Sequence, residues 1–333
     1  MVNKKIQKKI IVIGSNSFSA GSLISFLLNK NVKVFGISRS NINKKNFLRF
    51  NSKSKNFKFF KYDLNKNVKE ILHLIKRIKP EFIINYASQS MVGQSWKNSS
   101  DWFYTNSYNT VKFYEALTTL DLKFKLIHVS TPEIYGNLET NISETKIYNP
   151  TTPYAVSRVT ADQYLDILNR RKKIFYCSIR ASNVYGEYQR LYRIIPKTIF
   201  SILKNQKLSL DGGGFSKRNF IHIDDVTAAT YKIMNRGKSG EIYHISGSDI
   251  ISIRDLVKHI CKIMNYKFSK LVKIGPERPG KDKFYNISSK KLNYQMNWRT
   301  KISLDKGINR CIDWIKRDLK FFSKKDINYI HKK

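Results

Sequence analysis

The stretch that decides the fold is Ile10-Ile11-Val12-Ile13-Gly14-Ser15-Asn16-Ser17-Phe18-Ser19-Ala20-Gly21. Its four β-branched residues are typical of a buried strand, and the small residues after them predict a tight turn into a helix. Such a turn lets a pyrophosphate approach the backbone and the helix N-terminus. The predicted cofactor contacts here are Gly14, Asn16, Ser17 and Phe18. Because Ser17 and Ala20 stand where glycines are commoner, the turn alone is equally compatible with an ordinary strand-to-helix connection.

Short apolar runs alternate with longer amphipathic stretches from residue 9 to about residue 185. The predicted strands are residues 10–13, 32–37, 57–62, 82–86, 125–130 and 175–180. The predicted helices are residues 20–29, 68–78, 101–119 and 153–170. Strands separated by helices indicate an α/β protein with a doubly wound parallel sheet of the Rossmann type. Thr152 followed by Pro153 predicts a sharp helix start, with an N-cap hydroxyl and then proline in the first turn.

The second half of the chain is organised differently. The alternation weakens after residue 186, although residues 253–264 and 303–316 still have a helical pattern. A chain of 333 residues, 41% of them hydrophobic, can bury a large core in one domain or in two lobes. We therefore predict that residues 1–185 are mainly the dinucleotide-binding domain. Residues 186–333 are then mainly a smaller α/β substrate lobe, with some chain crossing between the two.

The composition argues against several classes of protein. No apolar run approaches the roughly 20 residues that span a bilayer, so we expect no membrane segment. The lysines before residue 10 imitate an export signal, but the apolar run ends at Gly14 and is interpreted as the first core strand. The three cysteines, Cys177, Cys261 and Cys311, form no metal-ligand or disulfide pattern. Buried thiols in a reducing cytoplasm, with no metal site, are the expectation.

The net charge of +38 raises the question of nucleic-acid binding. Lysines are spread along the whole chain among asparagines and isoleucines, as in residues 41–58 and 321–333, and they form no single basic arm. No zinc spacing or nucleic-acid module accompanies them. The pattern therefore indicates a solvated basic surface, useful for collecting an anionic substrate, rather than a nucleic-acid partner.

The end of the second predicted strand bears on the choice of cofactor. An NAD-preferring site has a carboxylate there for the ribose 2′-hydroxyl, whereas this chain has Ser38-Arg39-Ser40. A guanidinium with small hydroxyl donors suits a 2′-phosphate, so the sequence predicts NADP, with NAD as the alternative. Arg39 is otherwise one more surface cation. Asp63 and Leu64, after the third predicted strand, are expected near the adenine, although Asp63 equally suits a cap on the next helix.

The segment Tyr154-Ala155-Val156-Ser157-Arg158 places a phenol and a cation one helical turn apart. The cation favours the phenolate, so the pattern predicts a pKa of Tyr154 below the usual value of about 10. Beside a nicotinamide, such a phenolate can take the hydroxyl proton of an alcohol while the carbon gives up hydride. Upstream, residues 130–136 add a hydroxyl and a carboxylate at a predicted strand end. Together these groups predict chemistry between a sugar and a nicotinamide.

Several pieces of the chain, in the same order, resemble the extended short-chain dehydrogenase/reductases, and specifically the sugar-nucleotide 4,6-dehydratases. The matching pieces are the Gly14 turn and residues 85–90, 130–136, 154–158, 180–186 and 218–226. The resemblance extends from Ile10 to about Trp314. The segments after the second and fourth predicted strands are more similar to the NADP-using GDP-mannose branch than to the dTDP-glucose branch.

The resemblance implies an internal redox cycle on a hexose bound to a nucleoside diphosphate, with the cofactor unchanged at the end. Tyr154 takes the C4 hydroxyl proton, Thr131 holds the C4 oxygen, and Glu133 removes the C5 proton. Water leaves from C6, and the hydride taken from C4 returns there. The implied product is a 4-keto-6-deoxy sugar nucleotide for deoxysugar biosynthesis.

The resemblance also implies binding residues and an assembly. It implies Ala87 as a cofactor contact, together with Tyr154 and Arg158. The implied substrate contacts are Ser90, Asn183, Arg218 and Arg278. A homodimer is implied as well, built through the predicted helices 101–119 and 153–170.

Two residues depart from the family pattern. Pro132 stands where the dTDP-glucose enzymes carry an acid, so Glu133, Thr131 or water must protonate the departing C6 hydroxyl. The GDP-mannose branch lacks that acid too, so dehydration stays credible. Arg158 stands where the family has lysine, and a guanidinium does not replace the compact ammonium that reaches the nicotinamide ribose.

Three alternatives stay open at the level of the sequence. A sugar-nucleotide epimerase or decarboxylase on the same scaffold would share Tyr154 and the cofactor, but 4-epimerisation needs no base at C5, so Glu133 discriminates. A non-catalytic binder of NADP or a nucleotide sugar is suggested by Arg158, Ser17 and Ala20. A nucleic-acid binder would show strongly salt-dependent affinity for DNA that NADP leaves unchanged.

Overall fold

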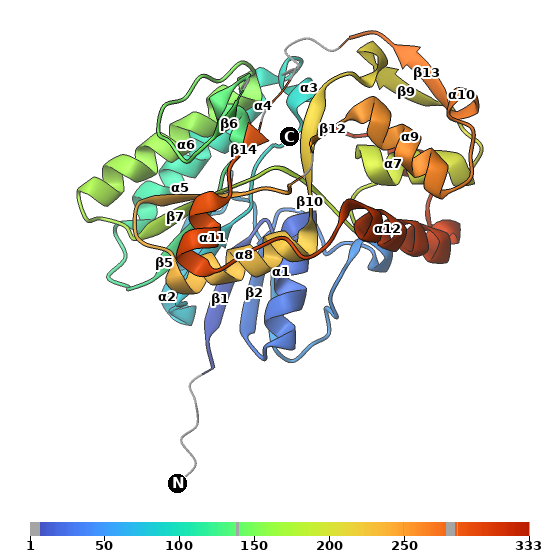
Figure 1. Ribbon diagram of the computed structural model, residues 1–333. Helices are drawn as coiled ribbons and strands as arrows, with labels where there is room; N and C mark the ends of the chain where they lie inside the picture. Colours follow the sequence, from blue (N-terminus) through green and yellow to red (C-terminus); the bar gives the residue numbers. More distant parts are fainter. Residues whose placement is uncertain (1–6, 138–139, 249, 278–283, 285, 333) are drawn as a thin grey trace.

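A parallel β-sheet forms the centre of the computed structural model, which describes residues 7–137, 140–248, 250–277, 284 and 286–332 (Figure 1). Among these residues the main sheet has seven strands, in the order β11-β7-β5-β4-β1-β2-β3, and every neighbouring pair is parallel. The strands are β1 (Lys9–Ile13), β2 (Lys33–Ser38), β3 (Phe57–Lys61), β4 (Phe82–Asn85), β5 (Lys125–Val129), β7 (Tyr176–Ala181) and β11 (Glu241–Ile245). The predicted doubly wound sheet is confirmed, and β11 joins it from the second half of the chain.

Helices cover both faces of this sheet. On one face α1 (Phe18–Asn29) packs beside α8 (Ile223–Arg236), and their apolar side chains share a core with β1 and β2. On the other face α2 (Val68–Ile78), α5 (Thr110–Leu117) and α6 (Pro153–Arg170) complete a second core. Because both faces are covered, the central strands are almost continuously apolar, which is the pattern read from the sequence.

Side-chain caps fix the starts of the two helices that border the cleft. Ser17 is the N-cap of α1, and its hydroxyl accepts a hydrogen bond from the backbone N–H of Ala20. Thr152 caps α6 in the same way by accepting from the N–H of Ala155, with Pro153 in the first turn. The sharp start predicted for α6 is confirmed.

The region predicted as one helix over residues 101–119 is not a continuous α-helix. After α4 (Ser99–Trp102), residues Phe103–Asn109 form a π-helix that leads into α5. The side chains of Asn109 and Thr110 donate to the carbonyls of Tyr104 and Thr105, five residues earlier, which stabilises the wider turns. A π-helical segment inside a helix often marks a functional site, and this one carries Asn106, whose amide bonds to Gln89 and Ser157.

The smaller lobe is built mainly from the second half of the chain. Its helices α7 (Ile194–Leu203), α9 (Ile253–Ile263) and α12 (Leu304–Asp318) pack around a core that includes Leu256 and Trp314. Two small sheets accompany them: β12 (Ile250–Ser252) with β10 (Lys217–His222) and β8 (Asn183–Tyr185), and β13 (Val272–Gly275) with β9 (Leu208–Asp211). A third, β14 (Asn286–Ile287) with β6 (Asn141–Ile142), packs against Tyr135 and Val159 on the side of α6. Short helices complete the fold: α3 (Val92–Ser95), α10 (Phe268–Leu271) and α11 (Lys290–Met296).

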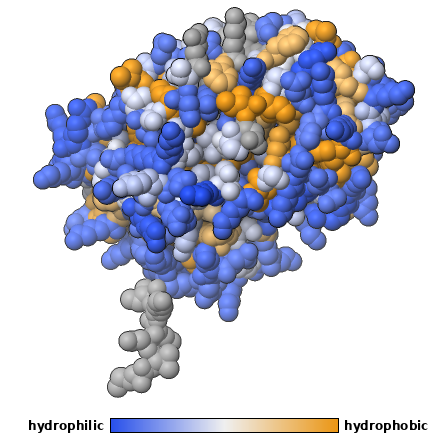
Figure 2. Space-filling model, viewed as in Figure 1, coloured by the Kyte–Doolittle hydropathy of each residue, from blue (hydrophilic) through white to orange (hydrophobic). Residues whose placement is uncertain are grey.

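The surface and the cysteines agree with the composition. Hydrophilic residues cover most of the face shown in Figure 2, and hydrophobic side chains gather mainly around its centre and right. Cys177, Cys261 and Cys311 are buried and unpaired, and burial raises the pKa of the Cys177 thiol to about 12. In the part of the chain that the structure describes, no helix is both long enough and apolar enough to cross a membrane.

Candidate active site

The candidate site lies at the carboxyl ends of the central strands, where the strand order reverses between β1 and β4. Gly14 follows β1 with φ of +76°, and a Cβ added there would lie 2.7 Å from the backbone nitrogen of Ala87, which follows β4. This close approach requires glycine, because a side chain would fill the crevice. A cavity of about 690 Å³ opens at this point between the sheet and the smaller lobe.

The four predicted catalytic residues line this cavity together. Thr131 follows β5 and is the N-cap of a 3₁₀ turn, Pro132–Tyr135, where its hydroxyl accepts from the N–H of Glu133 at 3.3 Å. The first turns of α6 contribute Tyr154 and Arg158. The hydroxyl, carboxylate, phenol and cation therefore meet at one place, although they come from separate segments.

The pKa predicted for Tyr154 is wrong in direction. Burial of the phenol raises its pKa above the usual value, and this effect outweighs the positive charge of Arg158. The carboxylate of Glu133 raises the pKa further, whereas a hydrogen bond with Thr131 and the charge of Arg193 lower it. The sequence indicated the neighbouring cation, but it could not indicate that the hydroxyl is buried and therefore desolvated.

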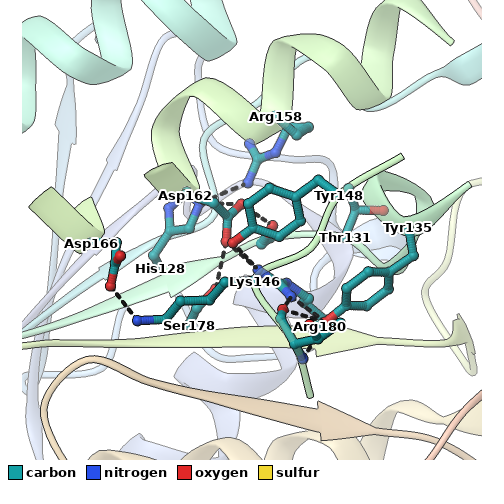
Figure 3. Close-up of polar contacts among 12 residues, drawn as sticks. His128, Thr131, Tyr135, Lys146, Tyr148, Arg158, Asp162, Asp166, Ser178 and Arg180 are labelled. Carbon is teal, nitrogen blue, oxygen red and sulfur yellow. Dashed lines mark hydrogen bonds and ion pairs between the residues drawn. The ribbon is translucent and has the colours of Figure 1, made fainter. Parts of the chain in front are cut away.

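The guanidinium of Arg158 reaches toward His128 and the end of β5 (Figure 3). Its guanidinium donates from Nη2 to the carbonyl of Val129 and lies 3.4 Å from Nε2 of His128. The residue is 2% exposed, and its Nε has no hydrogen-bond partner within the described part of the chain. The longer side chain therefore reaches the end of β5.

His128 links Arg158 to a chain of buried polar groups. Its Nδ1 lies 2.6 Å from the hydroxyl of Tyr114, which accepts from the side-chain amide of Asn85. Burial lowers the pKa of His128 below its usual value, so the ring is neutral at pH 7. With the Tyr114 hydroxyl donating to Nδ1, the Nε2–H faces the carboxylate of Asp162, 3.7 Å away, because the Arg158 guanidinium can only donate.

A buried ion pair lies beside this chain of groups and supports the strand ends (Figure 3). Oδ1 of Asp162 in α6 lies 2.9 Å from Nη2 of Arg180 in β7, and the two side chains are 2% and 0% exposed. Asp162 also accepts from the hydroxyls of Ser130 and Ser178. Arg180 donates to the hydroxyls of Tyr135 and Tyr148. The pair thus fixes both sides of the segment that carries Thr131 and Glu133.

The predicted cofactor residues gather around the Gly14 crevice. A second cavity, of about 160 Å³, is lined by Gly14, Ser17, Ser38, Arg39, Asp63, Leu64 and Ala87. It shares Ser17, Tyr86 and Ser88 with the larger cavity, which Asn16 and Phe18 also line. Two adjoining cavities at a strand-order reversal fit an elongated dinucleotide, with its adenosine end between β2 and β4 and its nicotinamide end toward Tyr154.

Other contacts on this side are local. Asn16 donates from its amide to the hydroxyl of Ser40 at 3.0 Å and so supports the loop after β2. Asp63 accepts from the backbone N–H of Asn65 at 2.9 Å, which stabilises the turn before α2, but it does not cap that helix, whose N-cap is Asn67. Asn106 donates to the carbonyl of Gln89 and accepts from its N–H, which holds the segment after β4 in place.

The predicted substrate residues Ser90, Asn183 and Arg218 line the larger cavity, whereas Arg278 lies outside the described residues. The sequence reading missed three further cations on its wall: Arg190, Arg193 and Lys197. Arg190 and Arg193 precede α7, with Arg193 at its N-cap, and Lys197 lies in its first turn. Because two of the three residues lie outside the helix and the chain has many other basic residues, no local pattern distinguished them.

Comparisons with known proteins give a consistent set of relatives. A family model described as GDP-mannose 4,6 dehydratase matches residues 11–311. A probable dTDP-glucose 4,6-dehydratase of Sinorhizobium fredii is 26% identical over 323 residues, which cover 92% of each chain. The human dTDP-D-glucose 4,6-dehydratase is 28% identical over 325 residues, which cover 93% of this chain and 91% of the relative.

Solved structures share the fold over nearly the whole chain. The dTDP-glucose 4,6-dehydratase DesIV of Streptomyces venezuelae, with NAD and TYD bound, superposes with a TM-score of 0.88 at 22% identity, covering 94% of this chain and 98% of that one. The UDP-glucuronic acid 4-epimerase of Bacillus cereus, in complex with UDP-glucuronic acid and NAD, superposes with a TM-score of 0.83 at 24% identity, covering 93% of this chain and 99% of that one. Dehydratases and epimerases thus share this architecture, and the side chains of the cavity must distinguish them.

Proposed function

The chain belongs to the GDP-mannose 4,6-dehydratase family, and we propose that it converts a nucleoside-diphosphate hexose into its 4-keto-6-deoxy form. One observation carries this proposal above all. A buried tyrosine, a threonine hydroxyl and the carboxylate of Glu133 line one cavity beside the Gly14 crevice. Dehydration needs a base for C5 in addition to the groups that handle the C4 hydroxyl, and Glu133 is suited to be that base.

In the proposed reaction, the side chains handle protons around the sugar ring. Tyr154 takes the C4 hydroxyl proton, and Thr131 holds the C4 oxygen through its hydroxyl. A bound nicotinamide dinucleotide supplies a hydride acceptor at C4 and a hydride donor at C6. The 4-ketone acidifies the C5–H, and Glu133 removes that proton.

The loss of water needs an acid at C6. Pro132 has no proton to give, although it occupies the turn next to the base. Glu133 carries a proton once it has taken the one from C5, and we propose that it hands this proton to the departing C6 hydroxyl. One carboxylate would then serve both steps, with Thr131 and Tyr154 fixing the sugar at C4. When the hydride returns to C6, C5 takes up a proton from solvent, and the proton that Tyr154 took from the C4 hydroxyl is released to solvent, so that one water is lost overall.

The basic wall of the smaller lobe suits the nucleotide end of the substrate. Arg218, Arg193 and Lys197 line the same cavity as Asn183. Guanidinium groups grip phosphates with paired donors, and an ammonium adds a point charge, so we assign this wall to the diphosphate. The product analysis below is designed to identify the nucleobase and the hexose of the substrate.

For the cofactor, Arg39 and Ser38 line the small cavity at the adenosine end, where they suit the 2′-phosphate of NADP.

Homodimerisation is also proposed, through the helices that carry the exposed rings of Tyr104 and Tyr108. These rings stack 6.0 Å apart and are 51% and 59% exposed, and Val156 and Ile167 of α6 are 40% and 46% exposed. The buried, unpaired cysteines support a reducing compartment such as the cytoplasm.

The experiment is a product analysis with a matched variant. The purified protein is incubated with NADP or NAD and, separately, with GDP-mannose, dTDP-glucose, CDP-glucose and UDP-N-acetylglucosamine, and the products are weighed by mass spectrometry. We expect one of these substrates to lose one water, and Glu133→Gln to abolish that loss while cofactor binding persists. A product of unchanged mass would indicate an epimerase, and unchanged water loss in Glu133→Gln would refute the role of Glu133.

A further inference from the structure

The segment after α12 returns across the cofactor side of the cleft. We call residues 323–332 the C-terminal strap; in Figure 1 the C-terminal end lies near the middle of the molecule. The ring of Tyr329 packs edge-on against Tyr192, which lines the larger cavity, with centroids 5.4 Å apart. His331 stacks on Trp102 at 4.9 Å, and its Nε2 lies 2.7 Å from a carboxylate oxygen of Asp101. The strap thus connects the wall of the smaller lobe to the helices of the larger one.

The end of the strap reaches the adenosine end of the proposed cofactor site. The backbone carbonyl of Lys332 accepts a hydrogen bond from Nη2 of Arg39 at 3.1 Å and another from Nε2 of Gln89 at 2.7 Å. Both donors line the small cavity beside the Gly14 crevice. An acceptor oxygen therefore lies between the end of β2 and the segment after β4, beside the place where a dinucleotide carries its adenosine ribose.

We propose that the C-terminal strap sets the cofactor selectivity of this enzyme: docked, it favours a ribose 2′-hydroxyl, and released, it leaves Arg39 to a 2′-phosphate. This inference rests on the proposed dinucleotide site but not on the dehydration. The residues that carry it are Lys332, through its carbonyl, and the two rings that anchor the strap.

Electrostatics and hydrogen-bonding capacity give the reason. NAD-preferring sites place an acceptor at the end of β2 for the ribose 2′-hydroxyl, and this chain has no carboxylate there. The Lys332 carbonyl accepts from Arg39 and Gln89, and a 2′-hydroxyl can take the place of Gln89 as one of its two donors. A 2′-phosphate presents only acceptor oxygens at neutral pH, which the carbonyl repels and which compete with it for the guanidinium. The docked strap therefore opposes the choice of NADP that Ser38-Arg39-Ser40 alone favours.

The test compares the affinities for NADH and NADPH, measured from cofactor fluorescence without any sugar substrate. The variant Tyr329→Ala/His331→Ala removes both anchors of the strap and leaves the cavity walls intact. We expect the ratio of the Kd for NADPH to the Kd for NADH to fall about tenfold, the factor of one regained charge-assisted hydrogen bond. Ile330→Ala is the matched control, because Ile330 lies between the anchors and is 67% exposed. It is expected to leave the ratio unchanged.

Two further variants keep the proposal open to refutation. Truncation after Phe322 removes the strap completely and is expected to shift the ratio in the same direction. Adding Arg39→Ala to the anchor variant is expected to abolish the gain for NADPH. Equal changes for both cofactors on release of the strap, or a gain that survives the loss of Arg39, would overturn the proposal. Because binding is measured without turnover, these outcomes do not depend on whether the protein is a dehydratase.

Discussion

Replacing Asp162 with asparagine tests the buried ion pair that supports the candidate site. The two side chains of the pair are 2% and 0% exposed, and Asp162 accepts from Ser130, Ser178 and Arg180. Asp162→Asn keeps the shape but removes the charge, so the guanidinium of Arg180 stays buried without its counter-ion. Breaking a buried pair on one side costs about 3–5 kcal/mol of the free energy of unfolding.

The assay is urea unfolding followed by circular dichroism, with Asp166→Asn as the matched control. Asp166 lies one turn later on α6 and pairs with Lys146 and Arg170, whose side chains are 49% and 71% exposed. The Asp166 side chain is 14% exposed, but both of its cations reach solvent. Its replacement is therefore expected to cost less than about 1 kcal/mol, because ion pairs at the surface contribute little. For a chain of this size, a loss of 3–5 kcal/mol lowers the urea midpoint by about 1 M. Equal midpoints for the two variants would refute the reasoning.

The same pair predicts a pH dependence. Burial raises the pKa of Asp162, but Arg180, His128 and Ser130 together outweigh burial and hold it well below its usual range. A carboxyl with a depressed pKa stabilises the fold above its unfolded pKa of about 3.9, and that stabilisation is lost as the pH falls toward the folded value. The stability difference between the native protein and Asp162→Asn is therefore expected to be constant from pH 7 to pH 5 and to shrink below about pH 4. A difference that grows on acidification would contradict this cause.

The remaining predictions concern catalysis and assembly. Tyr154→Phe is expected to lower kcat by about 10²- to 10⁴-fold, because it removes the group that takes the proton. Since burial raises the pKa of Tyr154, the activity of the native protein should rise with pH on the alkaline side of neutrality; a rate unaffected by the missing hydroxyl would remove Tyr154 from the mechanism. Tyr108→Arg places a charge on the exposed aromatic surface and is expected to convert a dimer into monomers in sedimentation analysis, whereas a native protein already monomeric would exclude the proposed assembly.

Much of the larger lobe could be predicted from the sequence because its signals are local. The apolar runs that became β1 and β4 and the cap at Thr152 depend on a few neighbouring residues. The π-helix within residues 101–119 could not be predicted, because its hydrogen bonds span only one residue more than those of an α-helix. Its stabilising bonds, from Asn109 and Thr110, appear only in three dimensions.

In the candidate site, too, local motifs could be predicted from the sequence, whereas features that depend on the three-dimensional surroundings could not. The order of the motifs predicted that Thr131, Glu133 and Tyr154 belong to one site, and the three residues line one cavity. The pKa of Tyr154 was misjudged because desolvation depends on everything that surrounds the phenol, not on the cation one turn away. The contact between Arg39 and Lys332 joins residues 293 positions apart, and no pattern within either segment indicates it.

The most direct test of the proposed 4,6-dehydratase reaction is to follow the hydride that leaves C4. A nucleoside-diphosphate hexose that is accepted as substrate is prepared with deuterium at C4, and the product is examined by mass spectrometry and NMR. Internal transfer predicts a product that has lost one water and carries the deuterium at C6, with none accumulating in free cofactor. Deuterium that stays at C4 of an isomer, or that leaves the sugar altogether, would contradict a 4,6-dehydratase.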